Sequence, residues 1–244
     1  MLRLFLSVLF LGMSGLAQSE VPVDKTTLIK QKLSSVVRGL QIKSVADSAL
    51  PGIFEVASDS DQVLYITEDA RHFFAGDLYR LSADGLENLT EKRREKARAE
   101  LLKTVPDSEK VIFAPKNAKD VKAKITVFTD IDCFYCRKLH NEVPLLNEYG
   151  IQVDYLAYPR AGIGSKSYDK VVSTWCAKDR NTTMTLAKQG KEVPDLKCDN
   201  PVDAQFELGH RMGVTGTPAI FLESGQVIRG YMPADKMARS LGLL

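Results

Sequence analysis

The sequence Cys133-Phe134-Tyr135-Cys136 places two cysteines close enough for reversible disulfide chemistry. The apolar run Ile125 to Phe128 before them is typical of a buried strand, and Arg137 to Glu148 after them is typical of a helix. A helix N-terminus stabilises a thiolate, because its backbone N–H groups are free and its dipole is positive there. We therefore expect Cys133 to be the nucleophile and Cys136, one turn further, to be the more buried, protonated cysteine that resolves a mixed disulfide.

A CxxC pair also occurs as half of a zinc site or as a structural bridge. Zinc would need a second ligand pair, but Cys176 and Cys198 do not form a CxxC and no histidine cluster replaces them. We therefore favour redox chemistry, and we expect neither a metal nor another cofactor.

Three ionisable residues flank the pair. Asp130 and Asp132 should raise the pKa of Cys133 if their charges face it, and otherwise they are exposed loop or N-cap residues. His140 follows Cys136 by one turn and would lower a cysteine pKa when protonated. We favour a surface or packing role for His140 with no effect on catalysis.

Thr217-Pro218 precedes the strand-like run Ala219 to Phe221. A cis proline at the start of a strand can present open backbone groups, and here Thr217 could then pair with a substrate strand. Because trans is the usual form of such bonds, the residues alone favour an ordinary trans proline.

The distant cysteines, Cys176 and Cys198, would enclose a polar loop that packs poorly by itself. A bridge around such a loop is worth about 3 kcal/mol by the chain-entropy estimate. We favour a structural disulfide over a second redox pair, and we place the neighbouring Trp175 in the core.

The remaining pattern divides the chain in two. An amphipathic helix at Thr26 to Gly39 and five short apolar runs between residues 42 and 81 predict a small antiparallel sheet with one helix, which buries little core alone and needs a partner surface. Asn88 to Val105 resembles a capping box followed by a mostly solvated linker helix, with a loop between Pro106 and Pro115.

From about residue 122 the pattern is that of an α/β domain. Beyond the elements that flank the CxxC, we expect a strand at 151–156, helices at 167–186, 202–212 and 235–241, and a hairpin of strands at 219–222 and 227–228.

The N-terminus has the form of a secretory signal, with an apolar run from Leu4 to Met13 and small residues up to Ala17, after which we expect cleavage. The run is too short for a membrane-spanning anchor. Lys plus Arg number 33 against 31 Asp plus Glu, so charge gives no reason to expect a nucleic-acid partner.

Several motifs together resemble the DsbC family of bacterial periplasmic disulfide isomerases. These are Phe128-Thr129-Asp130-Ile131 before the CxxC, Leu139-His140, the segment from Tyr155 to Arg160, Trp175-Cys176-Ala177, Gly216-Thr217-Pro218 and, near the N-terminus, Gly76-Asp77-Leu78-Tyr79. The resemblance covers nearly the whole mature chain.

The resemblance implies an α+β, cystatin-like dimerisation domain at 18–84 after a signal peptide at 1–17, a linker helix and hinge at 85–118, and an α/β thioredoxin-like catalytic domain with a helical insertion at 119–244. It also implies a V-shaped homodimer, a cis Pro218, a structural Cys176–Cys198 bridge and substrate contacts by Phe134, Tyr135, Thr217 and Pro218. The implied partners are misfolded disulfide-containing exported proteins and a DsbD-type membrane reductase.

The chain departs from the family pattern at the reactive thiol. Phe134 stands where the family often has Gly, and Asp132 stands where it often has Thr, so the redox potential cannot be copied from relatives. We expect an isomerase that also binds unfolded chains. The alternatives are a DsbG-like reductase of sulfenylated cysteines, a more oxidising dithiol donor, or a holdase chaperone.

Overall fold

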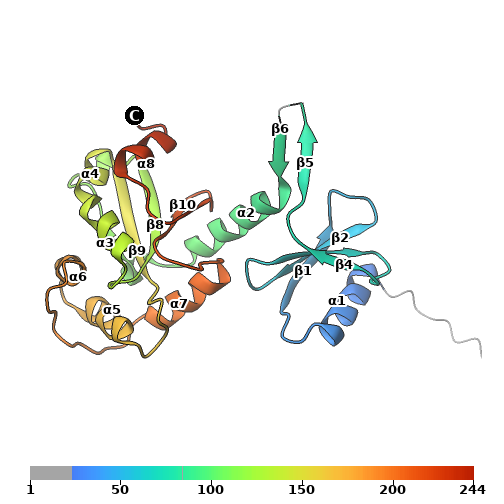
Figure 1. Ribbon diagram of the computed structural model, residues 1–244, viewed down its shortest axis with the longest axis horizontal. Coiled ribbons are helices and arrows are strands. Elements are labelled where there is room, and N and C mark those ends of the chain that lie inside the picture. Colours follow the sequence, from blue (N-terminus) through green and yellow to red (C-terminus); the bar gives the residue numbers. More distant parts are fainter. Residues whose placement is uncertain (1–23, 84) are drawn as a thin grey trace, which may run out of the picture.

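In the computed structural model, which describes residues 24–83 and 85–244, helix α2 joins a small α+β part to a larger α/β part (Figure 1). The expected signal peptide, 1–17, lies outside the described residues. None of the described helices combines the length and the hydropathy that a bilayer span requires.

The smaller part is the expected antiparallel sheet with one helix. Helix α1 (Lys25–Val36) begins at Asp24, whose carboxylate accepts the N–H groups of the first turn. Its buried Ile29 and Leu33 pack on the sheet. The strands, in the order β1-β2-β3-β4, are β1 (Ile42–Asp47), β2 (Ile53–Ser58), β3 (Val63–Thr67) and β4 (Phe73–Ala75).

We had expected the fifth apolar run to belong to that sheet, but it does not. Strand β5 (Tyr79–Ser82) pairs with β6 (Gly85–Asn88) in a separate hairpin that stands beside the start of α2 (Figure 1). Leu78 explains the change, because its N–H donates to Thr90 Oγ1 and its carbonyl accepts the N–H of Leu89. The chain is thus bonded to α2 instead of to β4.

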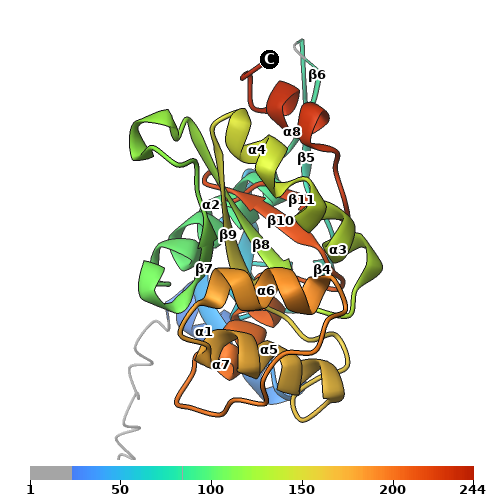
Figure 2. The ribbon, with the colours of Figure 1, turned by 90° about the vertical axis from the view of Figure 1, so that its left-hand side faces the viewer.

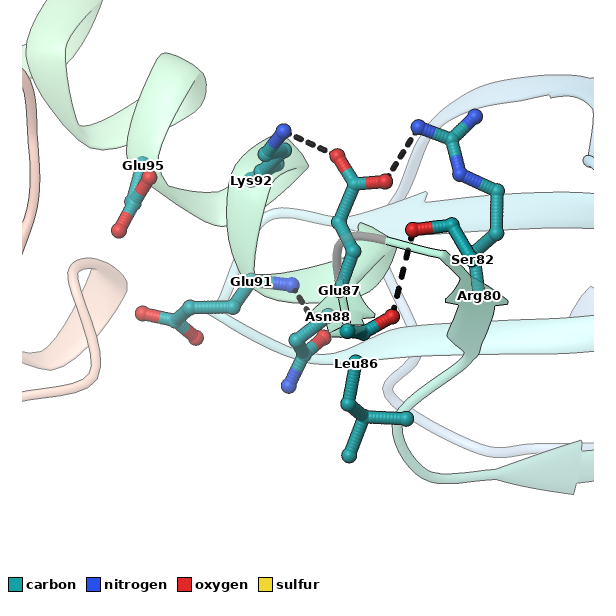
Figure 3. Close-up of a pocket in the computed structure, with 9 residues that line it drawn as sticks. Arg80, Ser82, Leu86, Glu87, Asn88, Glu91, Lys92 and Glu95 are labelled. Atoms are coloured by element: carbon teal, nitrogen blue, oxygen red, sulfur yellow. Dashed lines mark hydrogen bonds and ion pairs between the residues drawn. The ribbon is translucent and has the colours of Figure 1, made fainter.

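A charged hollow lies between this hairpin and α2 (Figure 3). Within it the Glu87 carboxylate lies between Arg80 and Lys92 and pairs with both. No cysteine lines this hollow.

Helix α2 (Leu89–Lys103) contains only half of the expected capping box. Asn88 Oδ1 accepts the Glu91 N–H at 2.8 Å. The Glu91 carboxylate turns instead to Arg98, whose Nη1 lies 2.6 Å away. The expectation of a mostly solvated helix also needs correction, since Arg98 is 1% exposed and pairs with Asp61 of the small part as well.

The same helix packs against the larger part. Leu101 and Leu102 contact the cluster around Phe128. Gly225, at φ +86°, lies so close to the backbone of Glu95 that a Cβ there would collide with the Glu95 carbonyl oxygen. Helix α2 is therefore held by contacts from both parts of the chain.

The larger part has a five-stranded sheet in the order β11-β10-β8-β9-β7. Its central strands, β8 (Ala123–Thr129) and β9 (Ile151–Ala157), are parallel, and every other pairing is antiparallel. The remaining strands are β7 (Val111–Phe113), β10 (Ala219–Leu222) and β11 (Val227–Arg229). Strand β7 lies in the segment between Pro106 and Pro115 that we had expected to be a loop. It also lies before residue 119, where we had expected the catalytic domain to begin.

Helices cover both faces of this sheet (Figure 2). Helices α3 (Phe134–Asn141), α4 (Val143–Glu148) and α8 (Ala234–Ser240) share one hydrophobic cluster with the sheet, together with α5 (Lys166–Cys176) and α6 (Arg180–Lys188). Helix α7 (Val202–Arg211) and the end of α2 pack on the other side, against Phe128 and Phe221.

Two helices that we had expected to be continuous are broken. The segment 137–148 divides at Glu142, because Pro144 lacks the N–H that would continue the first helix. The segment 167–186 divides before Asp179, whose carboxylate accepts the Thr182 N–H at 3.0 Å and starts α6. The first break follows from a proline and the second from an N-cap.

Candidate redox site

The CxxC lies where β8 ends and α3 begins. Cys133 is the N-cap of α3, and its Sγ accepts the Cys136 backbone N–H at 3.4 Å. Neither cysteine forms a disulfide, and both are buried, Cys133 at 2% and Cys136 at 0% exposure. Cys136 is the more buried of the two, as we had expected.

The two thiols differ strongly in acidity. The hydrogen bond from the Cys136 thiol lowers the pKa of Cys133 most, burial opposes it, and Thr217 and the Cys136 backbone N–H lower it further, giving a fall from 9.0 to about 5. Burial raises the pKa of Cys136, and its hydrogen bond to Cys133 raises it further. The pair therefore holds one proton, and Cys136 keeps it.

Asp132 is an exposed loop residue, which was the alternative that we had left open, and it does not raise the pKa of Cys133. Its carboxylate pairs with Lys170 Nζ at 2.8 and 2.9 Å and with Arg137 Nη2 at 3.1 Å. These two cations offset its charge, and the pKa of Cys133 is lowered, not raised.

Asp130 is neither exposed nor an N-cap, which corrects our alternative for this residue. It is 2% exposed, and its carboxylate accepts from Ser167 Oγ at 2.5 Å and from the Arg160 N–H at 2.9 Å. Burial raises the pKa of Asp130, but these hydrogen bonds outweigh it and the net shift is downward. Asp130 thus fixes the loop between β8 and α3.

The Thr217–Pro218 segment lies against the reactive sulfur. The Thr217–Pro218 peptide bond is cis, and the Thr217 carbonyl oxygen lies 3.2 Å from Cys133 Sγ. The sequence had suggested a trans bond from the residues alone, and the cis form only from the family resemblance.

Aromatic side chains surround the entrance to the site. Phe134 and Tyr135 are 71% and 55% exposed. The Tyr135 ring stacks on Tyr231 with centroids 6.4 Å apart, and Lys138 Nζ lies 4.5 Å from the Tyr231 centroid. Tyr231 lies far along the chain, and sequence reasoning missed it.

His140 is a packing histidine, as we favoured. Its Nδ1 lies 3.1 Å from Tyr155 Oη and its Nε2 lies 3.1 Å from Thr185 Oγ1. Burial, followed by the charge of Lys188, lowers the pKa of His140 to about 3. It carries no charge that could stabilise a thiolate at neutral pH.

A disulfide joins Cys176, at the end of α5, to Cys198, and it encloses α6. Trp175 is 1% exposed in the core, and its Nε1 donates to the Glu109 carbonyl at 2.8 Å. In residues 24–83 and 85–244, no group of three or more His, Cys, Asp or Glu side chains is arranged to hold a metal ion.

The comparisons with known proteins agree with this geometry. Residues 16–91 match the family described as "Disulfide bond isomerase protein N-terminal domain", and residues 111–243 match the "Thioredoxin-like domain". The thiol:disulfide interchange protein DsbC of Dickeya dadantii is 39% identical over 235 residues, which span 96% of this chain and 92% of that protein. The chain belongs to the DsbC family.

Other relatives extend the match. The DsbC protein of Escherichia coli K12 is 36% identical over 97% of this chain and 93% of its own, and that of Pasteurella multocida is 37% identical over 98% of both. The crystal structure of a disulfide interchange protein from Neisseria gonorrhoeae covers 57% of this chain and 96% of its own at 26% identity, with a TM-score of 0.50.

Membership in the DsbC family confirms two expectations. The chain is a thiol:disulfide interchange enzyme. Its fold class is also as expected, with an α+β N-terminal domain of the isomerase type, a connecting helix and a thioredoxin-like C-terminal domain with helical insertions.

Proposed function

We propose that this DsbC-family enzyme corrects wrong disulfides of exported proteins, with Cys133 as nucleophile. The Cys133 thiolate attacks one sulfur of the substrate disulfide, the substrate S–S bond breaks, and the other substrate sulfur leaves as a thiolate. The observation that carries the proposal is the place of Cys133 as the N-cap of α3, where its Sγ accepts the Cys136 N–H. The pKa of Cys133 falls there to about 5, while Cys136 keeps its proton.

The mixed disulfide can be resolved by either of two reactions. In isomerisation, another substrate thiolate attacks the substrate sulfur and releases the Cys133 thiolate with no net redox change. In reduction, Cys136 attacks Cys133 Sγ, a Cys133–Cys136 disulfide forms, and the substrate gains two electrons. A dithiol donor must then reduce the enzyme, and the proposed donor is a membrane reductase of the DsbD type.

Four residues are proposed to contact the substrate: Phe134, Tyr135, Thr217 and Pro218. The exposed Phe134 and Tyr135 rings offer apolar contacts around the sulfur. The Thr217 backbone, whose carbonyl lies 3.2 Å from Cys133 Sγ, offers a partner for an extended substrate strand. The Cys176–Cys198 bridge is proposed to be purely structural.

The proposed assembly is a homodimer through the N-terminal domains. The match to the isomerase N-terminal domain supports it, and so do exposed apolar side chains on β4 and the β5–β6 hairpin, among them Phe73, Leu81 and Leu86. Export with cleavage after Ala17 and a periplasmic location are also proposed. The proposed domain limits are 18–84, 85–118 and 119–244, with β7 of the linker segment pairing into the sheet of the last domain.

The test is reactivation of scrambled ribonuclease by the purified mature protein in a fixed glutathione buffer. Wild type is compared with Cys133→Ser, which removes the nucleophile. We expect reactivation by wild type and its loss in the variant. Equal reactivation by both proteins would reject Cys133 as the nucleophile. Failure of wild type here, together with reduction of a sulfenylated protein thiol, would support a DsbG-like reductase instead.

Binding of unfolded chains is tested separately, by suppression of aggregation of a cysteine-free substrate. The double variant Cys133→Ser, Cys136→Ser should suppress aggregation as well as wild type does, because the apolar surfaces are intact. If the double variant lost this suppression, binding would depend on the thiols.

A further inference from the structure

Lys188 is a buried lysine with no role in the function proposed so far. It is the last residue of α6 and is 3% exposed. Its Nζ donates to Thr129 Oγ1 at 2.8 Å and to the Asp130 carbonyl at 3.4 Å. The ammonium lies 5.4 Å from the centroid of the Tyr155 ring. It is thus held under the loop that leads into the CxxC.

The environment of Lys188 lacks the carboxylate that usually accompanies a buried lysine. In the described part of the chain, no carboxylate forms an ion pair with its Nζ. The Asp130 carboxylate is turned away toward Ser167 and Arg160. A buried charge without a counter-charge is costly, so a negative charge that forms nearby during the reaction would be stabilised by this ammonium.

The ionisable groups around Lys188 show which side chains can become negatively charged near it during the reaction. On α3, His140 is neutral at physiological pH, and Arg137 binds the Ile131 carbonyl and Asp132. On β9, burial raises the pKa of Tyr155 far above its ordinary value, so this phenol also stays neutral. Asp130 has a constant charge. Only the sulfurs of Cys133 and Cys136 change charge during catalysis.

Electrostatics link Lys188 to Cys136 in both directions. The ammonium lowers the pKa of the Cys136 thiol, against the larger effect of burial. Burial lowers the pKa of Lys188 to about 8, and the negative sulfur of Cys136 acts in the opposite direction. At neutral pH Lys188 therefore remains mostly charged, and its Nζ contacts Thr129 and Asp130, the segment that leads into the CxxC.

We propose that the buried ammonium of Lys188 stabilises the Cys136 thiolate during the resolving step. Lys188 is a positioning residue in this role, because it acts through Cys136 and does not touch the substrate. The inference rests on the function proposed above.

In the mixed disulfide Cys133 carries no charge and no longer holds the proton of Cys136 by a hydrogen bond to a thiolate. The Cys136 thiol then loses its proton to solvent. The thiolate attacks Cys133 Sγ and forms the Cys133–Cys136 bond. The bond from Cys133 to the substrate breaks, and the departing substrate sulfur takes the electron pair and then a proton from solvent. Lys188 is an ammonium before and after.

The test uses dithiobis(nitrobenzoate) as a substrate for the reduced full-length protein in stopped flow. The first nitrothiobenzoate released reports attack by Cys133, and the second reports resolution by Cys136. In Lys188→Met we expect the second phase to slow about tenfold and its pH profile to move up by about one unit, while the first phase changes less than about twofold.

Two further variants separate charge from structure. Lys188→Gln keeps donors for Thr129 and the Asp130 carbonyl but removes the charge, and it should slow the second phase as Lys188→Met does. Lys191→Met removes an exposed lysine three residues away and should leave both phases unchanged.

The outcomes distinguish the two proposals. A normal first phase with an unchanged second phase in Lys188→Gln would overturn the role of Lys188 alone. A wild-type protein with no first phase would overturn the proposed function itself.

Discussion

The acidity of Cys133 gives the sharpest prediction, tested by titrating the reduced protein between pH 3 and pH 10. With a pKa of about 5 in place of 9.0, Cys133 is about 99% thiolate at pH 7, where an ordinary cysteine of pKa 9.0 would be about 1%. The ultraviolet absorbance of the thiolate should therefore rise with a midpoint near pH 5.

The rate of alkylation at pH 7 is a poor substitute for this midpoint. The thiolate fraction increases about a hundredfold, but a Brønsted coefficient of about 0.4–0.5 lowers the intrinsic reactivity of the thiolate by a similar factor. The two effects nearly cancel, so the pH dependence of alkylation should shift strongly while its rate at pH 7 changes little.

Two variants check the assignment. Cys133→Ser should abolish the transition near pH 5. Cys136→Ala removes the hydrogen bond that lowers the pKa of Cys133 most, so the midpoint should rise. A wild-type midpoint close to 9.0, or a transition near pH 5 that persists without Cys133, would refute the argument.

The same shift affects the stability of the reduced form. Since the pKa of Cys133 is lower in the folded than in the unfolded chain, ionisation stabilises the folded chain increasingly between pH 5 and pH 9, by roughly 2–3 kcal/mol at pH 7. This stabilisation is lost as the pH falls through about 5. The oxidised form, which has no titrating thiol, should not show it in denaturant unfolding.

Three other perturbations test the framework around the site. Gly225→Ala should lower the free energy of unfolding by more than about 3 kcal/mol, because the added Cβ meets the α2 backbone, whereas Gly230→Ala, at a similar positive φ with open space around it, should cost only about 1–2 kcal/mol in urea unfolding. His140 should remain neutral in NMR titrations between pH 5 and 8, and a titrating signal near 6.5 would contradict this. Because folding lowers the pKa of His140, the unfolded chain binds the extra proton below pH 6.5, and the folded chain should lose up to about 1.4 kcal/mol of stability per pH unit there. Arg98→Met should lower the free energy of unfolding by about 3 kcal/mol, because Asp61 loses its buried cation, and an unchanged thermal midpoint would contradict this.

Much of the fold was predictable from periodicity and turn residues. Strands β8 and β9 and helices α1 and α7 lie within a few residues of their expected positions, because each has a regular apolar face and a clear boundary. Prediction from the sequence failed where a tertiary contact determines the secondary structure. Strand β7 is three residues long, and only its pairing with β9 makes it a strand.

The site was predictable in its sulfur chemistry but not in its electrostatics. Spacing placed Cys133 at a helix N-terminus, but it could not reveal that Lys170 and Arg137 offset Asp132. Lys188 carried no signal either, since a lysine at the end of an amphipathic helix usually faces solvent. Charges contributed by α5 and α6 become visible only once these helices are placed over the sheet.

The bridge between Cys176 and Cys198 encloses α6 and therefore the helix that carries Lys188 and the hydroxyl partner of His140. Four cysteines can form two disulfides in three ways, and only one of them leaves Cys133 and Cys136 paired with each other. A newly made chain is consequently a client before it is a catalyst. Its own maturation requires one pairing out of three, the same kind of selection that it is proposed to make for its substrates.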